Sequence, residues 1–283
     1  MQSRRKQDSD EAGIERVYSP TGSQRATDNP AMRLLAFDTS TDVMSVAVGC
    51  SFDGVPRVWE HTAAGGAKAS GSLIPAILDL MAQAGLGFAD LDAIAFGRGP
   101  GAFTGLRTAC SVAQGLGFGA RGSAGGRAVP LLPIDSLLAL AEEARYRHAS
   151  SALPLQVLAM LDARMDQIYA AAYTFDGTHW KQRQPTLLER PEDLSLDFAP
   201  DSVGGMLAGN VFAAYAHRLP AGAHLTRIDA LPTAVAMLHL APALLAAGHG
   251  VSPELALPLY IRDKVAQTSS ERAAAKALAP SPP

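Results

Sequence analysis

The sequence predicts an α/β fold with two lobes, each built on a mixed sheet whose elements follow the order β-β-β-α-β-α. Two observations predict it. Residues 32–149 begin with three short apolar runs separated by turns and then alternate helical and extended patterns. Residues 155–262 repeat part of that order with shorter, proline-rich loops, which predicts a reduced second lobe. This order is that of the ribonuclease H-like fold, which actin-like ATPases use twice.

Three consecutive strands open the first lobe. The runs 33–37, 43–50 and 55–61 are apolar or weakly alternating, and turn-rich residues separate them. Short turns between strands favour an antiparallel meander. Two further buried-type strands are expected at 91–96 and 129–134, each followed by a helical pattern, so the sheet is expected to be mixed with helices on its faces.

The first predicted helix spans about 72–84 and has apolar residues at three- and four-residue spacing, typical of one buried face. Ile74 and Leu78 lie on a different side of this helix, so it is expected to be covered on two sides. The residues of the main apolar face are Leu73, Ile77, Leu80, Met81 and Ala84.

The second predicted helix spans about 104–120 and carries small residues that allow close approach of another helix. A third helix is expected to be capped by Asp135 or Ser136 and to run to about Tyr146. The residues on one side of the second helix are Leu106, Ala109, Cys110, Ala113 and Leu116.

The second lobe is expected to begin with strands at 155–161 and 167–175, a third strand at 180–188 and another at 202–208. Thr233 is the expected N-cap of its helix. We therefore predict lobes at 31–150 and 151–264. The flanking segments 1–30 and 265–283 are expected to be disordered, because they have too little apolar surface to offset the loss of chain entropy.

The composition excludes several classes of protein. Lysine and arginine number 24 against 27 aspartate and glutamate residues, a net charge of −3, which argues against a strongly basic nucleic-acid-binding domain. Two cysteines, Cys50 and Cys110, are too few for a disulfide framework and favour a reducing, cytoplasmic compartment. The first 30 residues lack the apolar core of a signal peptide. The charge-free stretch 230–248 contains two prolines and much alanine, which favours a buried helix over a membrane span.

The segment 97–107, Gly-Arg-Gly-Pro-Gly-Ala-Phe-Thr-Gly-Leu-Arg, is the most informative motif. Gly99 and Gly101 let the backbone turn tightly and approach another group, and Thr104 is placed to cap the following helix. Exposed N–H groups at that helix start could hold a phosphate, with Arg107 one turn further on. The alternative is a tight strand-to-helix turn with packing glycines. A Walker A loop is excluded, because Lys and Ser or Thr do not follow the last glycine.

An acidic motif follows the first strand of each lobe. In the first, the carboxylate of Asp38 could bind a divalent metal while Thr39 and Ser40 face a phosphate, or the segment could be a simple turn. In the second, Asp162 and Arg164 could form an ion pair at the cleft between the lobes, or a polar turn. No two of the seven histidines lie three to five residues apart, so the sequence contains no paired histidine metal motif.

The segments 35–41, 97–107, 161–169 and 258–262 together resemble the TsaB family, the bacterial subunit of the system that makes N6-threonylcarbamoyladenosine in tRNA. The resemblance spans about 32–264. It implies a two-lobed actin-like fold without catalysis of its own. The catalytic paralogue TsaD has a metal-binding His-x-x-x-His, and matching the strand at 129–134 places Ser136 and Leu140 at those positions, where neither side chain can hold iron or zinc.

The resemblance also implies partners. The two first-lobe helices are expected to bundle with the same helices of TsaD or of a second copy of this chain, with the ATPase TsaE as a third partner. The resemblance further implies that tRNA is contacted only through the complex, that an adenine nucleotide binds at most at the complex interface, and that no metal or membrane is involved. The expected interface residues are Leu73, Ile74, Ile77, Leu78, Met81, Ala109, Ala113 and Leu116. A charge introduced by Ala113→Arg is expected to break association while leaving the chain folded.

Two other functions compete with this scaffold role. An actin-like ATPase or kinase would use Asp38, the loop 99–105 and Asp162 around Mg-ATP, and turnover lost in Asp38→Asn would identify it. A glycopeptidase is the third reading, and the absence of both a paired histidine motif and a Gly-x-Ser-x-Gly nucleophile turn argues against it.

Overall fold

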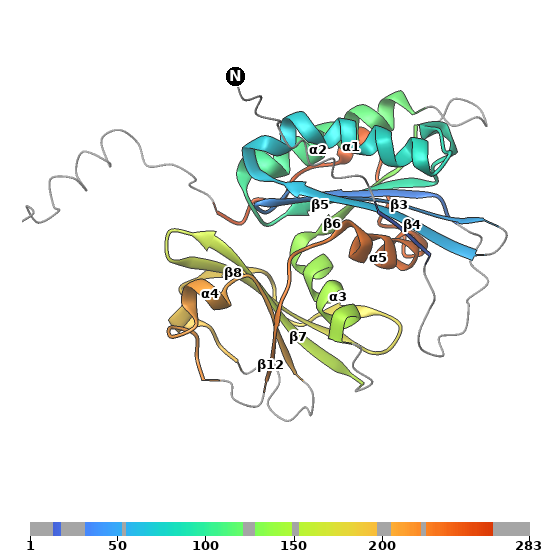
Figure 1. The fold of residues 1–283 in the computed structure, drawn as a ribbon. Coiled ribbons are helices and arrows are strands. Elements are labelled where there is room, and N and C mark those ends of the chain that lie inside the picture. Colours follow the sequence, from blue (N-terminus) through green and yellow to red (C-terminus); the bar gives the residue numbers. More distant parts are fainter. Residues whose placement is uncertain are drawn as a thin grey trace, which may run out of the picture.

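The computed structural model describes residues 14–17, 32–52, 55–120, 128–148, 153–196, 205–221 and 225–262. Two mixed sheets lie one above the other in Figure 1, with helices on the outer face of the first and between the two. The two-lobed α/β fold predicted from the sequence is confirmed. None of the helices within these ranges is long and apolar enough to cross a bilayer.

The first sheet has the strand order β1-β4-β3-β2-β5-β6. The predicted meander forms from β2 (Leu34–Asp38), β3 (Val43–Phe52) and β4 (Val55–Ala64), all antiparallel. β5 (Ala93–Gly99) and β6 (Leu131–Asp135) then add in parallel beside β2. Parallel strands end at the same edge of a sheet, so the chain segments that follow β2, β5 and β6 meet there.

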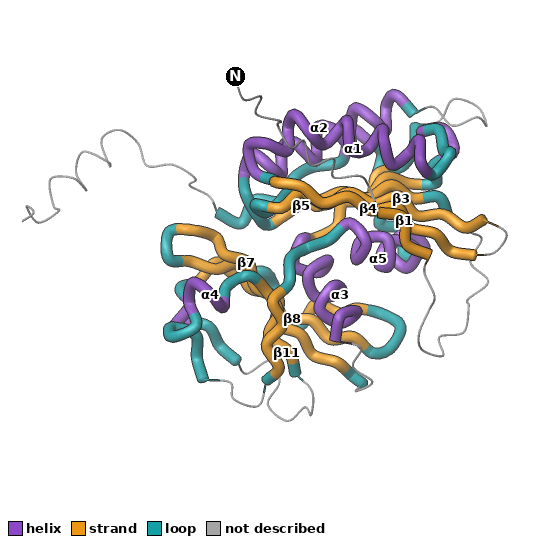
Figure 2. Tube along the Cα trace, viewed as in Figure 1, coloured by secondary structure: helices purple, strands orange, loops and turns teal. Residues whose placement is uncertain are grey.

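Two helices cover the outer face of this sheet (Figure 2). They are α1 (Ala69–Gln83) and α2 (Phe103–Gly119). Leu73, Ile77 and Leu80 of α1 are fully buried among side chains from β2, β3 and β5, as their spacing predicts. The burial of such branched and long apolar side chains stabilises the layer by about 1.5–3 kcal/mol each.

The second sheet repeats the order of the first, β10-β8-β7-β11-β12. β7 and β8 pair antiparallel as β2 and β3 do, and β11 and β12 run parallel to β7 as β5 and β6 run to β2. The repeat read from the sequence is thus a repeat of sheet topology. The strands are β7 (Leu155–Arg164), β8 (Gln167–Phe175), β9 (Trp180–Gln182), β10 (Leu187–Glu189), β11 (Met206–Gly209) and β12 (Thr226–Asp229).

The helices that follow the last strand of each lobe are exchanged between the lobes. α3 (Ser136–His148) leaves the first sheet and packs against β7, β8 and β11 of the second. α5 (Ala234–Ala246) leaves the second sheet and packs against β2, β3 and β5 of the first. The two helices also contact each other between the sheets (Figure 1). The charge-free stretch near 230–248 therefore forms a helix with a buried face, as expected.

Five elements differ from the expectations. Ile14–Val17, in the segment expected to be disordered, forms β1 against β4, so that expectation is wrong for these four residues. The remainder of 1–30 and all of 265–283 lie outside the described residues. The single strand expected at 180–188 is two short strands, β9 and β10, because Pro185 lies between them and cannot donate to the ladder. The short helix α4 (Phe212–Tyr215) and β12 were not predicted.

A buried carboxylate joins the exchanged helices. Glu142 of α3 is 3% exposed and accepts hydrogen bonds from Arg145 at 2.6 Å and from the Trp180 indole at 2.9 Å. His239 Nδ1, on α5, lies 3.4 Å from Oε1 of Glu142. Burial by itself raises the pKa of Glu142, but these donors outweigh it and lower the pKa to about 2. Glu142 therefore stabilises the contact between the lobes in its ionised form.

Replacing Glu142 by Gln is expected to destabilise the protein by about 3 kcal/mol at pH 7, because Arg145 loses its charged partner. The unfolded-state pKa of 4.5 exceeds the folded-state value of about 2, so the contribution is present above pH 4.5 and is lost as the pH falls towards 2. Urea unfolding at pH 7 and pH 3 checks this: the gap between wild type and Glu142→Gln should narrow at pH 3. Asp193→Asn, at an exposed carboxylate, is the control. An equal gap at both pH values would contradict the role given to Glu142.

Candidate functional site

The carboxyl edge of the first sheet faces the second lobe, and the predicted phosphate-binding segments meet there. β2 ends at Asp38, β5 at Gly99 and β6 at Asp135. Arg98 bridges two of these strands through its 2.5 Å ion pair with Asp135. In an open sheet that contains parallel strands, ligands bind at such an edge, so this is the candidate site.

The Asp38 carboxylate is enclosed by its own loop. Asp38 is 0% exposed and accepts hydrogen bonds from the Ser40 amide and hydroxyl, both at 2.7 Å. The Ser136 hydroxyl donates to its second oxygen at 3.3 Å, so Ser136 serves this carboxylate at the start of α3. Burial raises the pKa of Asp38 to about 6, although the hydrogen bonds from Ser40 and Ser136 oppose the shift.

The backbone of residues 97–105 lies directly against residues 38–40. A Cβ atom at Gly97 would stand 1.8 Å from Asp38 Oδ2, and one at Gly105 would stand 1.8 Å from the Thr39 carbonyl oxygen. The Ala102 amide donates to the Ser40 carbonyl at 2.7 Å. The Thr39 hydroxyl donates to the Gly105 carbonyl, also at 2.7 Å. The glycines therefore serve close packing of one backbone on another.

Three of the residues expected to face a phosphate are enclosed by this packing. Thr39 is 0% exposed and Ser40 is 2% exposed, and their hydroxyls bond to Gly105 and Asp38. With Asp38 also buried, the three side chains are enclosed and bonded within the chain. Of the two readings of the glycine motif, the tight turn with packing glycines matches the geometry.

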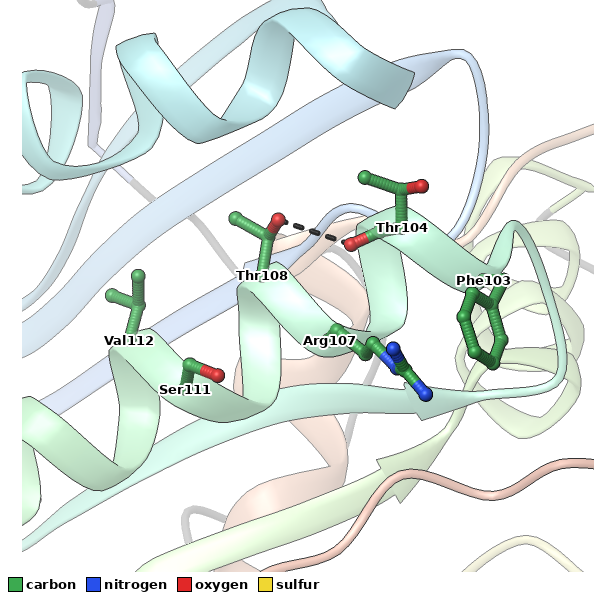
Figure 3. A pocket seen from close by; sticks show the side chains of 6 residues that line it. All are labelled: Phe103, Thr104, Arg107, Thr108, Ser111 and Val112. Carbon is green, nitrogen blue, oxygen red and sulfur yellow. Dashed lines mark hydrogen bonds between the residues drawn. The ribbon is translucent and has the colours of Figure 1, made fainter.

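The other residues expected to face a phosphate are Gly99, Gly101, Thr104 and Arg107. Gly99 is buried with a φ of +117°, and the Leu259 carbonyl oxygen would be 2.7 Å from a Cβ placed on it. Gly101 packs on the Ser40 carbonyl. Thr104 is exposed and does not cap α2, whose N-cap is Ala102 without a side-chain hydrogen bond. Arg107 is also exposed, and its guanidinium lies over the Phe103 ring (Figure 3).

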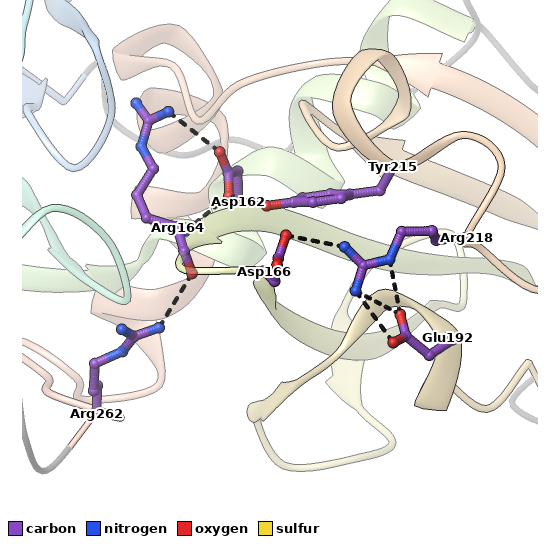
Figure 4. A network of polar contacts seen from close by, with 7 residues as sticks. All are labelled: Asp162, Arg164, Asp166, Glu192, Tyr215, Arg218 and Arg262. Atoms are coloured by element: carbon purple, nitrogen blue, oxygen red, sulfur yellow. Dashed lines mark hydrogen bonds and ion pairs between the residues drawn. The ribbon is translucent and has the colours of Figure 1, made fainter. Parts of the chain in front are cut away.

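A network of ion pairs holds the second lobe against the first. Arg164 contacts Asp42 of the first lobe and lies 3.3 Å from Asp162 of its own strand, so the ion pair, one of the two alternatives for this motif, is present. The three residues 164–166 all have positive φ, a strained conformation for side chains other than glycine. Arg218 steadies the far side of this turn through Asp166, as Figure 4 shows.

The segment 256–262, which we call the strap, links both lobes. The Leu259 amide donates to the Arg98 carbonyl at 2.7 Å, and the Arg262 guanidinium donates to Gln167 Oε1 at 2.8 Å and to the Ala163 carbonyl at 3.2 Å. A cavity of about 200 Å³ remains beneath the strap. No local pattern predicts a role for Tyr260 and Arg262 beyond the family resemblance, because their contacts lie about 95–153 residues away along the chain.

The outer face of α1 and α2 presents only part of the expected interface. Ile74 is 47% exposed and Leu78 52% exposed, whereas Leu116 is half-buried. The other five residues pack inside their own lobe, so their side chains are not part of the exposed face. These five are Leu73, Ile77, Met81, Ala109 and Ala113. Phe118, 53% exposed on α2, was missed because it lies outside the stripe chosen for close helix approach.

The burial of Ala113 also changes its use as a probe. Ala113 is 0% exposed and belongs to the core formed by α1, α2 and the first sheet. An arginine there would place a charge in that core, so Ala113→Arg is expected to unfold the lobe, not to leave it folded. Residues whose side chains already face outward are the sound choice for breaking an interface.

The described residues contain no group of three or more His, Cys, Asp or Glu side chains that could hold a metal ion. Ser136 and Leu140, the positions matched to the paralogue's histidines, are both 0% exposed. Leu140 packs with the second sheet, and Ser136 bonds to Asp38. An apolar side chain and a hydroxyl that already serves a carboxylate do not form a metal-ligand set.

Comparisons with known proteins give a consistent picture. Residues 64–201 match the family described as TsaD: tRNA N6-adenosine threonylcarbamoyltransferase. A protein of Escherichia coli, the tRNA threonylcarbamoyladenosine biosynthesis protein TsaB, is 32% identical over 83% of this chain and 96% of its own length. Its counterpart in Haemophilus influenzae is 32% identical over 83% of this chain and 95% of its own. The solved structure of YeaZ from Pseudomonas aeruginosa superposes with a TM-score of 0.69 at 34% identity, over 81% of this chain and all of that one.

The glycine contact is tested by Gly105→Ala. The added methyl would meet the Thr39 carbonyl, so a loss of about 3 kcal/mol in the free energy of unfolding is expected. Gly115→Ala is the matched control on the same helix: nothing lies within 4 Å of its Cβ position, and alanine is the better helix former, so this variant should be unchanged or up to about 1 kcal/mol more stable. Urea unfolding of both variants measures the two free energies of unfolding. If Gly105→Ala were as stable as Gly115→Ala, the two loops would not be in contact.

The enclosed carboxylate is tested by Asp38→Asn. The folded-state pKa of about 6 exceeds the unfolded value of 3.8, so the folded state binds more protons in this window. Wild-type stability should therefore fall, relative to Asp38→Asn, by about 3 kcal/mol as the pH rises from 4 to 7. Parallel stability profiles of the two proteins would contradict the burial of Asp38. Asp79→Asn, at an exposed carboxylate on α1, controls for general charge effects.

Proposed function

The chain belongs to the TsaB family, and from that we propose that it is a non-catalytic subunit that binds and activates a TsaD-type transferase forming N6-threonylcarbamoyladenosine in tRNA. The observation that carries the proposal is the packing of residues 97–105 on residues 38–40. It fills the edge of the sheet where an actin-like enzyme would hold its phosphates.

An ATPase or kinase would need Asp38 and Asp162 to be free to act on Mg-ATP, and both carboxylates are engaged within the chain. Asp38 is already bonded to Ser40 and Ser136, and Asp162 is engaged by Arg164 and the Tyr215 hydroxyl. A nucleotide phosphate could reach Asp38 only by separating two backbone segments joined at 2.7 Å. The proposal therefore places any adenine nucleotide at an interface between subunits, not inside this chain.

The outer helices α1 and α2 present exposed apolar side chains, as a binding subunit would. Ile74 and Leu78 lie one turn apart on α1, and Phe118 lies near the end of α2. Each is about half exposed, while the residues beneath them are buried. Large apolar side chains gathered on one helical layer are typical of a surface that another protein covers.

The proposed partner has the same architecture. Residues 64–201, which include α1 and α2, match the TsaD family model, so a TsaD-type transferase would present the same two helices. Two such pairs can pack as a four-helix layer. We propose that TsaE and tRNA bind to this complex. The competing possibility is a homodimer, in which a second copy of this chain covers the same face.

Ile74→Arg and Leu78→Arg test the interface. Both side chains already reach solvent, so the variants should keep the wild-type melting temperature within a few degrees. Each charge would have to be buried on association, so binding to the cognate transferase should weaken at least tenfold. Gel filtration and calorimetric titration at micromolar concentrations measure the association.

Leu153→Arg is the matched control, because Leu153 is 57% exposed but lies in the second lobe. It should bind the transferase as wild type does. If the wild-type chain forms no complex, or if it modifies tRNA unaided, the proposed function is wrong. If only Leu153→Arg weakens binding, the interface lies on the other lobe.

A further inference from the structure

Arg107 is the one charged residue among the 17 of α2. It lies one turn into the helix and is exposed. α1 likewise carries a single charge, Asp79, whose carboxylate accepts a hydrogen bond from Gln83 at 2.8 Å. The other residues of α1 and α2 carry no charge.

The guanidinium of Arg107 is held in place by aromatic groups. Its central carbon lies 3.8 Å from the centre of the Phe103 ring, a cation–π contact. Its Nε donates to the Tyr260 hydroxyl at 3.1 Å, and the Phe103 and Tyr260 rings lie 5.1 Å apart. The strap therefore reaches across to fix an arginine on α2. An arginine fixed in this way loses less rotamer entropy when it binds a partner.

Arg107 also lines a shallow groove. The groove has a volume of about 420 Å³ and runs along one side of α2 for more than two turns (Figure 3). Its walls combine the Phe103 ring and Val112 with three small hydroxyl residues. The lining residues are Phe103, Thr104, Arg107, Thr108, Ser111 and Val112.

The charge of Arg107 is not neutralised within the described part of the chain. Arg98, Arg164 and Arg218 each have a carboxylate within ion-pair distance. Arg107 has only a phenol and a ring face, both neutral, so the outer nitrogens of its guanidinium have no ion-pair partner among the described residues. A cation fixed on a face that has no other charge favours a negatively charged group on whatever covers that face.

We propose that this groove receives an acidic side chain, aspartate or glutamate, from a helix of the partner subunit, and that Arg107 binds its carboxylate. The inference rests on the proposed function and adds the chemistry by which the partner is chosen. The planar guanidinium matches a carboxylate in a two-pronged hydrogen bond. The apolar walls suit the methylene groups of such a side chain, whereas a nucleotide phosphate would meet only one cation here.

Arg107→Glu tests the proposal in the complex with the cognate transferase. Binding should weaken at least tenfold through repulsion of the partner's carboxylate, and Arg107→Lys should weaken it less, because lysine keeps the charge but loses the two-pronged geometry. Tyr260→Phe should weaken binding a few-fold by releasing the arginine. Arg190→Glu is the control, because Arg190 is an exposed arginine of the second lobe. Melting temperatures verify that each variant is folded.

The decisive step is a charge exchange. Acidic residues on the outer helices of the transferase are changed singly to arginine. One of these transferase variants should bind Arg107→Glu more tightly than the wild-type transferase does. Raising the salt concentration should weaken the wild-type complex more than the Arg107→Ala complex.

Unchanged binding of Arg107→Glu, alongside loss of binding by Ile74→Arg, would overturn this inference while leaving the proposed function intact. Loss confined to self-association, to ATP binding or to tRNA binding would also overturn it, because the occupant would then be a second copy or a phosphate. A wild-type chain that does not bind the transferase would remove the proposed function itself.

Discussion

The close approach of two backbone segments at the carboxyl edge of the first sheet determines the character of this protein. Gly97, Gly101 and Gly105 bring one segment so near to residues 38–40 that side chains beyond hydrogen would collide. A motif that in sequence looks suited to cradling a phosphate is thereby used to close the site. Under the proposed function, this edge of the sheet serves packing within the chain, and the outer helical layer is the surface that a partner covers.

The two lobes are joined by helices that pack across their junction. α3 and α5 each complete the core of the other lobe, so neither sheet keeps its cover if the lobes separate. Glu142 joins these helices in the interior, Arg164 joins the lobes at the rim through Asp42, and the strap crosses the same junction. A surface formed before the encounter suits the binding role proposed for this chain, because little entropy is lost on association.

Local patterns predicted much of this fold, and long-range contacts account for what they missed. The three-and-four spacing of Leu73, Ile77 and Leu80 identified the buried face of α1, and the N-cap at Thr233 is confirmed by its hydrogen bond from Ala236. The direction faced by the glycine motif could not be predicted, because it depends on residues 38–40 lying opposite. The exchange of α3 and α5 and the left-handed turn at 164–166 depend likewise on contacts between lobes, and Arg, Met and Asp give no local signal for three positive φ angles in a row.

Hydrogen–deuterium exchange of the full chain distinguishes a closed sheet edge from a nucleotide site, with peptides compared for the free protein, the protein with Mg-ATP and the protein with the cognate transferase. We expect slower exchange over α1 and α2 when the transferase is added. We expect no change over residues 38–42 and 97–107 when Mg-ATP alone is added. Protection of those two segments by Mg-ATP alone, with the helices unaffected by the transferase, would show that the edge of the sheet opens to a nucleotide and that the protein acts there instead.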